Sequence, residues 1–145
     1  MAHGDRLEQQ LKDASQTAAE NREMSISAVI HSVLSIRTLA RRDLMARLSE
    51  TAYNFSGLAT GRLDEDQAII EGSKLDLAKE LKKVANLATK SGNPEDKFIA
   101  SALLALVSLH LTNRADLIKE VAAFAAVLGV EATKNLKRPS PPDSP

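Results

Sequence analysis

Proline is nearly absent from the body of this chain, and its absence constrains the fold more than any other feature. Four of the five prolines lie at positions 139, 141, 142 and 145, so Pro94 stands alone in the first 138 residues. Proline interrupts a helix interior, so long helices are permitted almost throughout. Residues favourable to helices are abundant, and β-branched residues never alternate with polar ones over a long run. We therefore predict an all-α fold, a bundle of four to five helices.

The spacing of apolar residues divides the chain into three segments. Residues 1–21 carry a narrow stripe at intervals of three and four, which predicts a marginal helix or arm without a partner. Residues 22–129 carry broader stripes and form the predicted bundle domain, whose last helix should end at Gly129. Residues 130–145 lose the apolar period and finish in a proline-rich sequence, which predicts a disordered or polyproline-type tail.

Within the bundle, the apolar residues over 24–55 stay on one broad face, which predicts a single long helix ending near Gly57. A second helix should begin at Ser73 and end at Gly92, and a third should run from Pro94 to Thr112 with Asn93 as its N-cap. This third helix is apolar almost all round, so we expect it at the bundle centre. A last helix is expected over 114–128. No repeat of solenoid period is visible.

Composition excludes several classes of protein. The 145 residues contain 19 basic and 19 acidic side chains, so no net charge draws the chain to nucleic acid or an anionic membrane. Without cysteine there are no disulfides, thiolate nucleophiles or sulfur-ligated metals. The most apolar segment, 98–111, is shorter than the roughly 20 residues of a membrane span. The first ten residues lack the apolar region of a secretory signal, so a cytoplasmic location is expected.

Catalytic and metal-binding motifs are missing as well. The histidines at 3, 31 and 110 have no partner at metal-ligand spacing, so we predict neither a metal site nor a cofactor. The phosphate-binding and nucleophile-elbow motifs do not occur, and the acidic triplet at 64–66 is interpreted as a solvated connection. His110 is expected to be a structural histidine near a helix end. We therefore expect a protein that is not an enzyme.

The arginines of the long predicted helix are its most informative feature. Arg37 and Arg41 project into the arc occupied by its apolar residues. One explanation is that they reach past the apolar edge, or pair with acidic side chains of a neighbouring helix such as the first. The other is that Arg41 and Arg37, together with Arg42 and Arg47, bind a carboxylate or phosphate of another molecule.

These features favour a noncatalytic helical module for protein–protein interaction, which uses the arginine-bearing face and self-associates as a homodimer. Two alternatives remain open. An exposed His31 on a helix face could be the phosphoacceptor of a histidine phosphotransfer-type signalling module. The chain could also be a small nucleic-acid-binding regulator, because residues 21–47 carry five basic and two acidic side chains, although no aromatic residue is interleaved with them.

Overall fold

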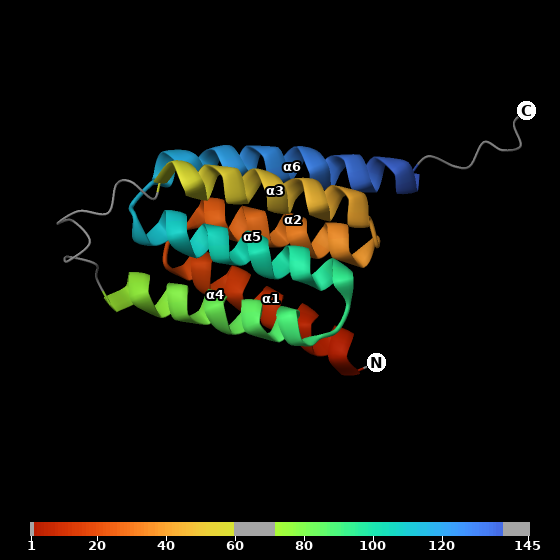
Figure 1. Cartoon of the computed structure of the whole chain (residues 1–145), viewed down its shortest axis with the longest axis horizontal. Helices are drawn as coiled ribbons and strands as arrows, with labels where there is room; N and C mark the ends of the chain where they lie inside the picture. The colour runs from red at the N-terminus through yellow and green to blue at the C-terminus, as the bar shows by residue number, and fades with distance from the viewer. Residues whose placement is uncertain (1, 60–71, 138–145) are drawn as a thin grey trace, which may run out of the picture.

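The computed structural model describes residues 2–59 and 72–137, and within these ranges the chain forms six helices and no strand (Figure 1). The all-α prediction is confirmed, with one helix more than expected. The helices are α1 (Ala2–Glu20), α2 (Met24–Thr38), α3 (Arg42–Ala59), α4 (Gly72–Lys90), α5 (Pro94–Leu111) and α6 (Ala115–Lys137).

The six helices pack as two layers of three. In one layer α5 lies between α3 and α4, and in the other α2 lies between α1 and α6 (Figure 1). The layers meet where α1 contacts α4, α2 contacts α5 and α3 contacts α6. Each middle helix therefore has neighbours on both sides and across the layer, which explains why α2 and α5 are the most apolar helices of the chain.

The prediction of one long helix over 24–55 is wrong. The chain turns between α2 and α3, where Ala40 adopts the left-handed conformation with φ 55°. The amide of Ala40 donates to the carbonyl of Arg37, and that of Arg41 donates to the carbonyl of Ile36, in the pattern that closes a helix C-terminus. The apolar period continues in phase across this turn, so that periodicity alone could not reveal it.

Both ends of the described chain also differ from expectation. The stripe of α1 is fully buried against α2 and α4, so this helix has partners and is part of the bundle. Helix α6 continues through Gly129 to Lys137, and Ala132 is buried, so the predicted stop at Gly129 is wrong. Gly129 lies against Ser32 of α2. The predicted connection at 64–66 and the last eight residues of the predicted tail lie outside the described residues.

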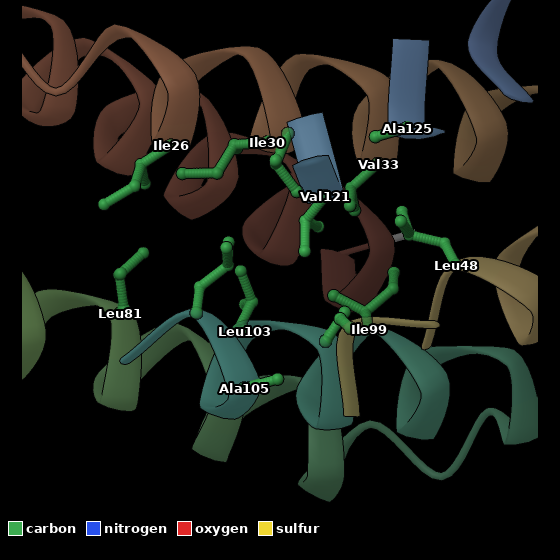
Figure 2. Packing of buried hydrophobic residues seen from close by; sticks show 14 of the residues in the cluster. Ile26, Ile30, Val33, Leu48, Leu81, Ile99, Leu103, Ala105, Val121 and Ala125 are labelled. Atoms are coloured by element: carbon green, nitrogen blue, oxygen red, sulfur yellow. The ribbon is translucent and has the colours of Figure 1, made fainter. Parts of the chain in front are cut away.

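The boundaries around α5 follow the prediction. Gly92 takes the left-handed conformation, φ 82°, and Pro94 opens the helix. The Asn93 side chain caps α5 by accepting a 3.0 Å hydrogen bond from the amide of Glu95. Helix α5 contacts both of its layer neighbours and the opposite layer. Figure 2 shows its side chains among those of four other helices in one core: Ile26, Ile30 and Val33 of α2, Leu48 of α3, Leu81 of α4, Ile99, Leu103 and Ala105 of α5, and Val121 and Ala125 of α6.

The two halves of the chain repeat one another. The turns that follow α1 and α4 place Arg22 and Gly92 in the left-handed conformation, in each case two residues after the helix ends. The turn before α3 and the turn before α6 are also equivalent, with Ala40 and Asn113 left-handed and the same five backbone hydrogen bonds around each. The two halves, α1–α3 and α4–α6, therefore share the order of three helices and an equivalent turn before the third.

The third helix of each half packs on the other half. Helix α3 lies on α5, whereas α6 lies on α2, so the two halves exchange their third helices. Exchange of this kind joins the two halves through a large shared core, because neither half covers its own middle helix. The sequence similarity between the two equivalent turns is short: Arg41, Asp43 and Leu44 recur as Arg114, Asp116 and Leu117.

Candidate functional site

The arginine-bearing segment of the sequence analysis lies at the turn between α2 and α3, and its first member is engaged inside the molecule. Arg37 Nε donates to Oδ1 of Asp96 at 3.0 Å, and Arg37 Nη2 donates to Oδ2 at 3.3 Å. Asp96 is only 1% exposed, whereas the Arg37 side chain is 17% exposed. Of the two explanations for Arg37, the structure favours pairing with a neighbouring helix, although that helix is α5 and not the first.

A small hydrogen-bond network holds Asp96 in place. Ser91 Oγ donates to Asp96 Oδ2 at 2.8 Å and accepts from the amide of Asn93 at 3.1 Å. Next to this network, burial and the neighbouring Asp96 charge raise the pKa of Glu95, against the opposing influence of Arg37 and Arg42. Glu95 Oε2 is enclosed and accepts no hydrogen bond from the described residues, which is consistent with that direction.

The other arginines make separate contacts. Arg41 donates from Nε and Nη2 to the two carboxylate oxygens of Asp43, at 3.1 and 2.9 Å, and this pairing lowers the pKa of Asp43. The guanidinium of Arg47 stands 5.8 Å from the ring centre of Phe124, within cation–π range, and joins α3 to α6. Arg42 is exposed near Glu95. The four arginines therefore point to three different places rather than converging on one ligand.

The two described histidines occupy different surroundings. His31 is exposed on α2, and His110 is 2% exposed in the last turn of α5, as its expected structural position requires. In the equivalent turns before α6 and α3, His110 of α5 takes the position of Arg37 of α2. The phosphoacceptor assignment of His31 and the nucleic-acid alternative remain predictions.

The surface feature missed by the sequence analysis is a hollow between α3 and α5. It has a volume of about 460 Å³, and Tyr53 and Leu104 lie on it with exposed fractions of 67% and 48%. The described residues that line it are Tyr53, Ser56, Thr89, Lys97, Ala100, Ser101, Leu104 and Ala105. We call this surface the α3–α5 groove. Leu104 belongs to the helix that was predicted to lie at the bundle centre, but the neighbouring helices leave the Leu104 side of α5 uncovered.

In the described ranges, no group of three histidine, aspartate or glutamate side chains is arranged to hold a metal ion. The same ranges contain no helix that combines the length and apolar character needed to cross a membrane.

Comparisons with known proteins return nothing similar to the chain: no family model, no curated protein and no solved structure matches it.

Proposed function

We propose that this protein is a noncatalytic helical interaction module that self-associates, and that the α3–α5 groove is the surface on which a second copy docks. The observation that carries the proposal is the pair of exposed side chains Tyr53 and Leu104 in that groove. A tyrosine combines a large apolar area with a polar hydroxyl, and such residues are enriched at the centres of protein interfaces.

Charge at the rim of the groove supports a second copy as the occupant. Glu50 precedes Tyr53 by one turn of α3 and is exposed, and Lys97 lines the groove from α5 and is exposed. Neither takes part in an ion pair among the described residues. In a twofold contact each surface meets itself, so Glu50 of one copy can face Lys97 of the other.

The arginine face is a weaker basis for self-association than the sequence suggested. Arg37 is committed to Asp96 and Arg47 lies on Phe124, so a partner would have to displace contacts that join helices of this chain. A partner bound in the α3–α5 groove would leave the contacts of Arg37 and Arg47 in place. Self-association is therefore proposed to use the α3–α5 groove and not the arginine face.

Sedimentation equilibrium over a range of protein concentrations tests the proposal. We expect the wild-type chain to form dimers, and Leu104→Asp to weaken the association roughly tenfold or more, since a buried carboxylate at an interface centre is unpaired. Val127→Asp is the matched control, because Val127 is 62% exposed on α6, away from the groove. A wild-type chain that stays monomeric would contradict self-association itself.

A charge exchange tests the surface independently. Glu50→Lys and Lys97→Glu should each weaken the dimer by placing like charges opposite one another, and the double exchange should restore it. Dimers that form equally well in both single variants would show that self-association uses another surface.

A further inference from the structure

A strongly basic hollow between α1 and α4 is not used by the proposed function. Its volume is about 390 Å³, and it is lined by Arg6 and Gln10 of α1 and by Lys83, Asn86, Leu87 and Lys90 of α4. The two helices run in opposite directions, so the beginning of α1 lies beside the end of α4 (Figure 1). This arrangement brings three cationic side chains from distant parts of the sequence to one place.

Among the side chains that the structure describes, no carboxylate lines this hollow to neutralise the three cations. Arg6, Lys83 and Lys90 make no ion pair among the described residues, whereas other basic side chains of the chain do. Lys90 stands in the last turn of α4, where a cation also offsets the helix dipole. That explanation does not extend to Lys83, two turns earlier, or to Arg6 on another helix. Like charges gathered without a counterion repel one another, and a bound anion relieves the repulsion.

The lining matches a phosphate group better than a simple halide. A guanidinium presents parallel N–H donors that fit two oxygens of one phosphate, and lysines add point charges with further donors. The side-chain amides of Gln10 and Asn86 supply additional donors and acceptors next to the cations.

The charges beyond the hollow limit the size of the anion. The stripe that holds Arg6 continues along α1 at seven-residue intervals to Asp13 and Glu20, and the stripe of Lys83 begins on α4 at Asp76. Because the helices are antiparallel, the carboxylates of Glu20 and Asp76 both lie toward the far end of the helix pair, away from the hollow. A long polyanion laid along α1 and α4 would meet these carboxylates, whereas a compact anion in the hollow would not.

We propose that the hollow formed by Arg6, Lys83 and Lys90 between α1 and α4 is a binding site for a compact phosphate-bearing anion. The phosphate can be inorganic, or it can be the ester group of a small polar molecule whose remaining hydroxyls meet Gln10 and Asn86. The site is independent of self-association through the α3–α5 groove, because the described linings of the two surfaces share no residue.

Calorimetric titration of the full chain in a phosphate-free buffer of fixed ionic strength tests the site. The probes are inorganic phosphate, pyrophosphate and glycerol 3-phosphate. We expect saturable binding of one phosphate-bearing probe per chain, and about tenfold weaker binding in Lys83→Gln and in Arg6→Gln.

Gln10→Ala distinguishes the two sources of the phosphate. It weakens the binding of glycerol 3-phosphate alone if the ester is the ligand, and it leaves the binding of all probes unchanged if phosphate alone is recognised. Either result supports the site.

Lys79→Gln is the matched control, since it removes the same charge from the exposed surface of α4 outside the hollow. Binding that is weakened equally by Lys79→Gln and Lys83→Gln would overturn the proposal, because it would report general electrostatic attraction. Absence of binding by all three probes at millimolar concentration would overturn it as well. Equally tight binding of a single-stranded oligonucleotide would contradict the restriction to compact anions.

Discussion

Arg37 and Asp96, separated by 59 residues in the chain, are joined by two parallel hydrogen bonds between α2 and α5, of 3.0 and 3.3 Å. The pair fastens the last turn of α2 to the first turn of α5. At the same place α2 ends and the chain turns into α3. The carboxylate also lies at the positive end of the α5 dipole, so its negative charge has three sources of stabilisation: Arg37, the Ser91 hydroxyl and the helix N-terminus.

Replacing Arg37 should be strongly destabilising. Arg37→Ala leaves the buried carboxylate of Asp96 without its charged partner, which typically costs about 3 kcal/mol or more. Chemical unfolding at neutral pH measures the loss. Arg42→Ala removes an exposed arginine five residues away and should change stability by no more than about 0.5 kcal/mol. Similar losses in both variants would mean that the Arg37 pair is not a stabilising contact.

At neutral pH the ionised side chain of Glu95 should lower the free energy of unfolding. Its pKa in the folded protein lies above the ordinary value of 4.5, mainly because of burial. The cost of ionising it is therefore present above the folded pKa, and it disappears as the pH falls below 4.5, where the group is neutral in both states. Glu95→Gln should melt at a higher temperature than the wild type at pH 7, and the difference should vanish at low pH. A difference independent of pH would contradict this account.

Titration of the Asp116 carboxyl should detect its ion pair with Arg114 in the turn before α6. The hydrogen bonds from Arg114, at 3.0 and 2.8 Å, lower the pKa of Asp116 to about 2. Carbon NMR of the side-chain carboxyl should report that value in the wild type. In Arg114→Gln the pKa should rise toward 3.8. The depressed folded pKa means that the contribution of Asp116 to stability is present above 3.8 and is lost as the pH falls through about 2.

The left-handed residues at the equivalent turns should respond in opposite directions. Arg22 has φ 66° and Gly92 has φ 82°. A side chain in this conformation costs about 1 kcal/mol relative to glycine. Arg22→Gly should therefore stabilise the protein modestly, and Gly92→Ala should destabilise it by about 1 kcal/mol. No atom of the described residues lies within 4 Å of a Cβ added at Gly92, so the loss would come from the backbone and not from a clash. Unfolding by urea measures both changes, and equal signs would contradict the assignment.

Arg47→Ala should lower the free energy of unfolding by about 0.5 to 1 kcal/mol, because only the contact with the ring of Phe124 is lost. Arg47→Lys keeps the charge and should recover part of that loss, since an ammonium also interacts with an aromatic face. Thermal unfolding of the two variants beside the wild type measures the difference. Complete equivalence of Arg47→Ala and wild type would show that the contact contributes nothing to stability.

The boundaries of α5 were predictable because capping depends on residues close together in the chain. Asn93 and Pro94 act within one helical turn, and Gly92 supplies the left-handed residue before them. The break before α3 carries no glycine or proline, and Ala40 adopts the left-handed conformation without either. Comparison of the Arg-x-Asp-Leu sequence at 41–44 with the same sequence at 114–117 would have revealed it, since a helix boundary was already expected at the second of these places.

The sequence by itself therefore determined the helical class, the apolar stripes and the capped turn before α5, since each depends on propensities and contacts within about one helical turn. Tertiary structure alone decided that α3 packs on α5 and α6 on α2. It also decided that Arg37 pairs with Asp96 of α5 and not with the first helix, and that Leu104 stays exposed. These outcomes depend on which helix faces lie opposite one another, and several packings of the same stripes satisfy the same periodicity. The basic hollow has the same origin, because Arg6 and Lys90 meet only when α1 and α4 pack antiparallel.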